Sequence, residues 1–204
     1  MSNPMDKSFV VASSIAADLS TVQSISMDLY MSTLNAKVVT ARSGDIGKTF
    51  QPLTDYALRL AGTTGTIVED IAVVASKITR MSVTLLQSEE KGRAIKSAME
   101  KHGAHNPAII QIKKLDDLVQ LETDHMMSDY ISAMRMMLLN IEFLATEVQS
   151  IFCLAVNCRI EASHCKEFRS DFESIATDIE QAAERVSGVV SLCQSRIGNE
   201  LSLR

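Results

Sequence analysis

The sequence predicts an all-α protein, an elongated antiparallel four-helix bundle made of two tandem helical hairpins. The 204 residues include no Trp, three Pro and eight Gly, so turn-forming residues are too few for many strands. Apolar residues recur at steps of three and four over long stretches, the heptad pattern of coiled coils. A helix–turn–helix motif also occurs twice, 122 positions apart, with Asn35 matching Asn157.

The first helix carries an apolar stripe and is expected to end at a turn over 43–48, where Gly44 and Gly47 permit positive φ. Its stripe is Val11, Ile15, Val22, Ile25 and Leu29. The second helix has the most regular seam, with steps of four and three in alternation. These seam residues are Leu53, Ala57, Leu60, Thr64, Ile67, Ile71, Val74, Ile78, Met81 and Leu85. Strands, with a side-chain period of two, do not produce this spacing.

A second turn is expected over 102–107, because Pro107 suits the first turn of a following helix. The third helix carries Met134, Met137, Ile141, Leu144, Val148, Ile151, Ala155 and Cys158. The turn after it, near Cys165, contains neither Gly nor Pro and is predicted from the repeat alone. The fourth helix carries Phe172, Ile175, Ile179, Ala182, Val186, Val189 and Cys193.

A lone hairpin would leave its apolar seam in water, at a cost of about 1.5–3 kcal/mol per side chain. We therefore expect both hairpins to pack into one bundle with small crossing angles. The predicted division is a first hairpin over 1–86, a helical extension over 87–124 with its turn at 102–107, and a second hairpin over 125–204. The extension either folds back as a short hairpin or stands out as two helices.

Composition excludes several classes of function. The net charge of −5, without a basic stripe that contains aromatic residues, argues against nucleic acid. The first residues lack the pattern of a secretory signal, and no apolar run approaches the length of about 18 residues that spans a membrane. The cysteines cluster in the second half, which indicates reduced thiols rather than a disulfide framework. We expect a cytoplasmic protein.

No catalytic constellation or phosphate-binding loop is recognisable, so we expect no enzyme activity and no cofactor. Cys158, His164 and Cys165 raise the question of a metal, with Cys153 one turn earlier. Their spacing contains no C-x-x-C pair and offers no clear fourth ligand. We therefore expect no metal site, and interpret Cys153 and Cys158 as replacements for small core residues.

The two motifs point to a known family. In the first, Leu34-Asn35-Ala36, Val38, Ala41-Arg42, Gly44-Asp45, Gly47 and Phe50 are in register with one tip pattern, and the second keeps Val156-Asn157, Ile160-Glu161-Ala162 and Phe172. This pattern resembles the hairpin tip of the cytoplasmic signalling domain of bacterial chemoreceptors (methyl-accepting chemotaxis proteins). In that family the hairpins dimerise into a four-helix bundle, and the tips form trimers of dimers and bind a histidine kinase and its coupling protein. The resemblance implies a single-chain mimic of such a dimer.

Family tips carry a Glu and an Arg one helical turn apart, which suits ion pairs between neighbouring dimers. The first copy has Val39 and Arg42 and the second has Glu161 and His164, so each keeps one half of the pair. The resemblance implies that the asparagines bond across the tip, the phenylalanines pack there, and the two charges contact neighbours. The predicted interaction residues are Asn35, Arg42, Phe50, Asn157, Glu161 and Phe172.

The resemblance thus implies a soluble chemoreceptor-like signal-transduction module. It would engage a chemotaxis histidine kinase and coupling protein, or other chemoreceptors, through its tips. Two alternatives stay open: a diverged structural bundle that binds another helical partner, and a helical sensor that binds a metal or small ligand. The chain would be a pseudo-dimeric monomer, with a higher oligomer left open.

Overall fold

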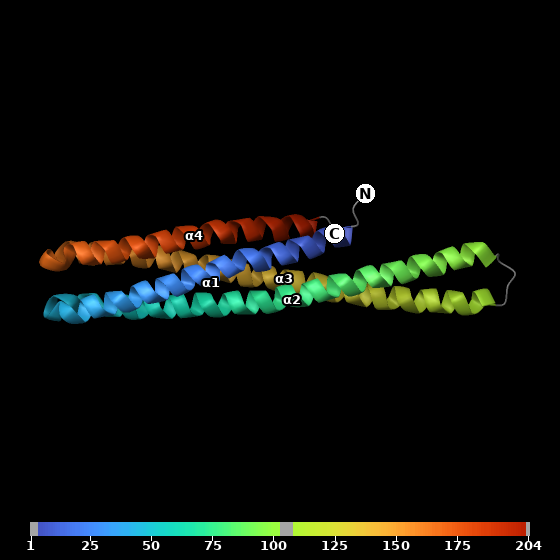
Figure 1. Cartoon of the computed structure of the whole chain (residues 1–204), viewed down its shortest axis with the longest axis horizontal. Coiled ribbons are helices and arrows are strands. Elements are labelled where there is room, and N and C mark those ends of the chain that lie inside the picture. Colours follow the sequence, from blue (N-terminus) through green and yellow to red (C-terminus); the bar gives the residue numbers. More distant parts are fainter. Residues whose placement is uncertain (1–3, 103–107, 203–204) are drawn as a thin grey trace.

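The computed structural model describes residues 4–102 and 108–202, and it confirms an all-α four-helix bundle (Figure 1). The helices are α1 (Pro4–Arg42), α2 (Gln51–His102), α3 (Ala108–His164) and α4 (Arg169–Ser202). Two short 3-10 helices, η1 (Gly44–Thr49) and η2 (Lys166–Phe168), lie in the turns at one end of the bundle. No strand occurs in the ranges that the structure describes.

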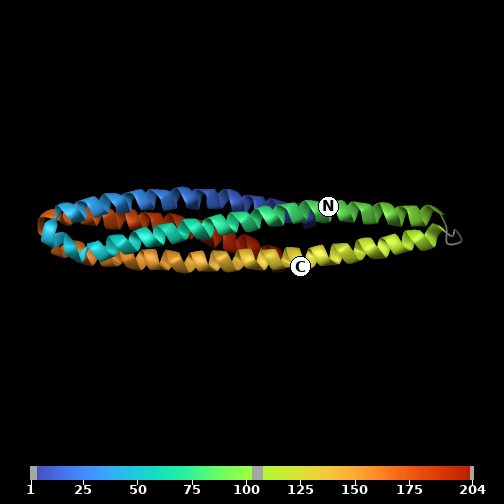
Figure 2. The ribbon, with the colours of Figure 1, turned by 90° about the horizontal axis from the view of Figure 1, so that it is seen from below.

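Each helix packs against two others. α1 contacts α2 and α4, and α3 contacts the same two helices, so α1 and α3 occupy diagonal corners of the bundle. Figures 1 and 2 show the elongated shape that results, with α1–α2 and α3–α4 as antiparallel hairpins. The two turns with η1 and η2 lie together at one end, which we call the tip end.

Two of the three predicted turns lie where the sequence placed them. The first separates α1 from α2, and Gly44 has φ +60° in it. The third separates α3 from α4 around Cys165, as the repeat predicted. Most of the predicted turn over 102–107 lies outside the described residues, since α2 is described to His102 and α3 from Ala108.

The core runs along the four-helix part, and positions 122 apart in the sequence are buried alike. Matching buried pairs are Leu19 and Ile141, Val22 and Leu144, Leu29 and Ile151, Ala36 and Cys158, Ala57 and Ile179, Ala61 and Ala183, and Val68 and Val190. The two hairpins therefore contribute the same faces to the core, which is the packing that the predicted repeat requires.

The predicted seam of α2 is too narrow. Leu53, Val74 and Met81 are only half-buried, whereas Val68 and Ala75, one position after predicted seam residues, are fully buried. A helix in a four-helix bundle faces two neighbours at once, so its buried stripe covers three positions per heptad instead of two.

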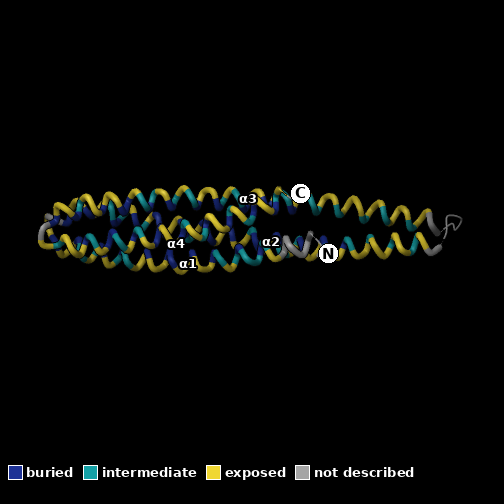
Figure 3. Tube along the Cα trace, turned by 90° about the horizontal axis from the view of Figure 1, so that it is seen from above, coloured by how far each residue is buried: buried dark blue, intermediate teal, exposed yellow. Residues whose placement is uncertain are grey.

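The extension stands out as two helices. α2 and α3 continue as a pair beyond the start of α1 and the end of α4 (Figures 1 and 3). At its base the hydroxyls of Ser88 and Thr123 are 2.7 Å apart and share a hydrogen bond. Further out, side chains are half-buried or exposed, because a pair of helices cannot enclose a core. The boundaries at 86/87 and 124/125 stay a prediction.

By length and composition alone, the segment Ile110–His164 of α3 would be able to cross a membrane. A core helix of a soluble bundle meets the same criterion, and 33% of its most apolar window is buried inside the bundle. This is weak evidence for a membrane span.

Candidate functional site: the two hairpin tips

An aromatic stack joins the hairpins at the tip end. Phe50 follows η1 and Phe172 lies in the first turn of α4, and their ring centroids are 3.8 Å apart with 16° between the planes. Both side chains are 0% exposed, so the predicted packing of the phenylalanines is observed. Neither ring can touch a partner directly. Any effect of these two residues on binding acts through the shape of the tip.

The first tip depends on a glycine. A Cβ atom at Gly47 would lie 2.3 Å from the carbonyl oxygen of Thr40, a backbone atom that cannot move aside easily. The same oxygen accepts a hydrogen bond of 2.9 Å from the Ser43 hydroxyl. The N–H of Phe50 donates to the carbonyl of Gly47 at 2.9 Å, which sets the ring at the start of α2. Only glycine fits this close approach.

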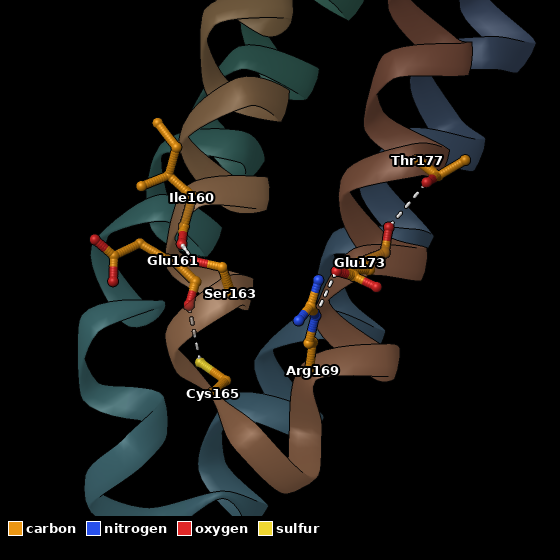
Figure 4. Close-up of polar contacts among 7 residues, drawn as sticks. All are labelled: Ile160, Glu161, Ser163, Cys165, Arg169, Glu173 and Thr177. Atoms are coloured by element: carbon orange, nitrogen blue, oxygen red, sulfur yellow. Dashed lines mark hydrogen bonds and ion pairs between the residues drawn. The ribbon is translucent and has the colours of Figure 1, made fainter.

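The second tip forms the corresponding turn without glycine (Figure 4). Arg169 matches Gly47 in the repeat, and α4 already begins there, whereas α2 begins only at Gln51. Arg169 forms an ion pair of 2.7 Å with Glu173 in the first turn of α4. The thiol of Cys165, which matches Ser43, donates to the carbonyl of Glu161 at 3.2 Å. A side chain at position 169 excludes the long 3-10 turn, so the regular helix starts earlier.

The predicted bond between Asn35 and Asn157 is wrong. Both side chains are exposed, and they lie on α1 and α3, which are diagonal in the bundle. No side-chain hydrogen bond of either asparagine is found within the described part of the chain. Both residues belong to the outer surface of the bundle instead of its centre.

The two predicted charges are placed on the outside of the tips. Arg42 is exposed and Glu161 is half-buried, and neither forms an ion pair with a described residue. Other charged residues nearby are paired within their own hairpin: Lys37 with Asp55 at 2.7 Å, and Arg159 with Glu180. These two pairs were not predicted from the sequence.

Exposed apolar side chains accompany these charges, which sequence reasoning also missed. Val38 is 58% exposed and Ile160, its match in the repeat, is 53% exposed. Met31 and Val156 are exposed beside them. We call Met31, Asn35, Val38 and Arg42 the first tip surface, and Val156, Asn157, Ile160 and Glu161 the second tip surface. The match of Val38 with Ile160 outside the heptad seams was the signal available in the sequence.

The cysteines differ in their environments. Cys158 is buried, as predicted, and burial raises its pKa to about 12. Burial likewise raises the pKa of Cys193 to about 11, with the nearby carboxylate of Asp18 acting in the same direction. Cys153, predicted to fill the core, is exposed instead. Within residues 4–102 and 108–202, no three His, Cys, Asp or Glu side chains are grouped to hold a metal ion.

Comparison with known proteins gives one distant relationship. No family model matches the chain. The chain is 30% identical over 99 residues to the methyl-accepting chemotaxis protein HlyB of Vibrio cholerae serotype O1. The match covers 45% of this chain and 18% of that protein, so the chain spans less than a fifth of its relative's length. The protein is thus distantly similar to a chemotaxis receptor, in agreement with the resemblance of its tips.

Proposed function

We propose that the protein is a cytoplasmic, non-enzymatic, chemoreceptor-like signalling module with a duplicated coiled-coil hairpin. It engages a chemotaxis histidine kinase and its coupling protein, or other chemoreceptors, through the two tip surfaces. One observation carries the proposal: Val38 and Ile160, at matching positions, are apolar and more than half exposed beside charges that the bundle does not use. An exposed apolar set beside polar residues is typical of a protein–protein interface.

The two tip surfaces are complementary to each other in charge. The first has the guanidinium of Arg42 and the second has the carboxylate of Glu161. Contact between the first tip surface of one molecule and the second tip surface of the next would bring these opposite charges together. Such a head-to-tail contact joins unlike surfaces and can close into a ring. A homodimer with two identical tips has no such distinction.

The experiment is co-sedimentation of the purified chain with a chemotaxis kinase and coupling protein from its own source. We expect wild-type protein to bind, and Val38→Asp and Ile160→Asp each to reduce binding, because each places a charge in an apolar contact. Val73→Asp is the matched control, since Val73 is 69% exposed on α2, far along the bundle from the tips. Binding by the tip variants that equals wild type would refute the proposal, as would no binding by wild type.

Charge reversal separates the two kinds of tip contact. Arg42→Glu alone is expected to weaken assembly of the chain with the kinase and coupling protein, measured by the same co-sedimentation. In the double variant Arg42→Glu, Glu161→Arg, recovery of assembly identifies a contact between the tips of two molecules. Persistent loss identifies contacts with the kinase or coupling protein themselves. If neither variant affects assembly, the tip charges do not contribute to it.

One observation favours the alternative of a bundle that binds a helical partner through the extension. Leu115, Leu118 and Leu121 follow one another at steps of three on α3 and are 51%, 63% and 59% exposed. Leu118→Glu in the same co-sedimentation experiment distinguishes the two functions. It leaves binding intact if the tips are responsible, and abolishes binding if the extension is.

A further inference from the structure

The middle of α3 carries an exposed apolar set that belongs to neither tip surface. Met136, Leu139 and Phe143 are 56%, 63% and 54% exposed, and their spacing of three and four puts them on one face of the helix. Arg135 and Glu142 flank them, both exposed, and neither forms an ion pair with a described residue. We call these five residues the α3 patch.

The bundle itself does not need the α3 patch. The matching positions on α1, 122 residues earlier, hold Ser13, Ser14, Ala17, Ser20 and Thr21. The core position between them keeps its character, since Ile15 and Met137 match and are both fully buried. The repeat therefore keeps the inner face of the helix and changes the outer one. The apolar and charged side chains of the patch are a feature of α3 alone.

We propose that the α3 patch binds the α3 patch of a second copy of this chain, with the two helices antiparallel about a two-fold axis at Leu139. At 3.6 residues per turn, Met136 and Phe143 lie about 60° and 40° to one side of Leu139. Arg135 and Glu142 lie about 40° and 60° to its other side. One flank is thus apolar, and the other carries opposite charges.

A two-fold axis perpendicular to both helices reverses their direction and keeps each flank on its own side. Leu139 then faces Leu139 of the second copy, and Met136 faces Phe143 of the second copy. On the other flank Arg135 faces Glu142 of the second copy. Each unlike contact occurs twice. The patch is therefore complementary to itself, because apolar side chains face apolar ones and opposite charges face each other. This internal complementarity is what identifies the occupant as a second copy.

A parallel arrangement fails on the same geometry. It would exchange the flanks, so that Arg135 would face Met136 and Glu142 would face Phe143 of the second copy. Burial of these charges against apolar side chains, without a partner, is unfavourable. The antiparallel arrangement also puts the tips of the two copies at opposite ends.

The first test is the mass of the full chain by sedimentation equilibrium over a range of concentrations. We expect wild-type protein to dimerise, and Leu139→Glu to raise the dissociation constant by about 30-fold or more, as for a central interface residue. Ala17→Glu is the matched control, because Ala17 is the exposed counterpart of Leu139 on α1. It should dimerise as wild type does. A monomeric wild type, or equal effects of the two variants, would overturn the proposal.

The second test fixes the orientation. Arg135→Glu should weaken the dimer, and Arg135→Glu combined with Glu142→Arg should restore it. In a Cys153→Ser chain, Ser132→Cys and Thr146→Cys lie on opposite sides of Leu139, and both positions are exposed. A short bis-maleimide should join a Ser132→Cys chain to a Thr146→Cys chain. Efficient cross-linking of Ser132→Cys to itself would contradict the antiparallel arrangement.

Discussion

At the scale of single residues, the stack of Phe50 on Phe172 is the contact that ties the two hairpins together at the tip. We expect Phe50→Ala to lower the free energy of unfolding by about 3–5 kcal/mol, because it leaves a cavity in a fully buried site. A double-mutant cycle with Phe172→Ala should give a coupling of about 0.5–1.5 kcal/mol. Urea denaturation followed by circular dichroism measures both quantities. If the changes in the free energy of unfolding of the two single variants add up to that of the double variant, the stack contributes no coupling energy.

The cysteines provide a second prediction at this scale. At pH 8, a thiol reagent should modify the exposed Cys153 quickly and the buried Cys158 and Cys193 only when the chain unfolds. Cys153→Ser should remove the fast phase. A fast phase of more than one thiol would contradict the burial.

Burial raises the pKa of Cys158 from 9.0 to about 12, so above pH 9 the thiol of Cys158 loses its proton in the unfolded chain before it does so in the folded chain. The free energy of unfolding should therefore fall as the pH rises from 9 towards 12.

At the scale of elements, the two turns at the tip end differ in what they require. Gly47→Ala should destabilise the protein by about 1–3 kcal/mol, because the new Cβ would overlap the carbonyl oxygen of Thr40. Arg169→Ala, at the matching position of the second tip, is the control. It removes only an exposed ion pair, which is worth about 1 kcal/mol or less. The midpoints of thermal unfolding of the two variants compare the turns. Equal decreases of the midpoint would show that Gly47 is dispensable.

Prediction from sequence succeeded for the positions of the helices and turns, and failed for details that depend on how the helices pack. Heptad spacing identified the helices, and glycines or the repeat located the turns, since both signals are local. The early start of α4 at Arg169 follows from a clash that only three-dimensional packing reveals. The asparagines were placed wrongly for a related reason. Periodicity shows that Asn35 and Asn157 match, but not that their helices lie on a diagonal.

At the scale of the whole molecule, the hairpins are expected to recognise each other without the chain that links them. The carboxylate of Asp178 accepts a hydrogen bond from Ser32 at 3.2 Å, and Arg196 on α4 pairs with Asp18 on α1. These bonds and the shared core join α1 to α4. Fragments 1–102 and 108–204, produced together, should therefore form a one-to-one complex with the helical content of the intact chain.

The thermal midpoint tests this prediction. In the Leu139→Glu background, the midpoint of the two-fragment complex should rise with protein concentration, whereas that of the intact chain should not. The covalent link makes association of the hairpins intramolecular and so removes its dependence on concentration. Fragments that stay folded apart would show that each hairpin has a core of its own.

The matched burial of positions 122 apart has a consequence for how such a molecule changes over generations. In a bundle of two identical chains, every mutation appears on both halves at once. Here the pairs Gly47 and Arg169, and Ala17 and Leu139, already differ, while core pairs such as Val22 and Leu144 stay apolar. One nucleotide change alters one face and leaves its counterpart intact. The chain can therefore acquire a new contact on one half while the other half retains the ancestral one.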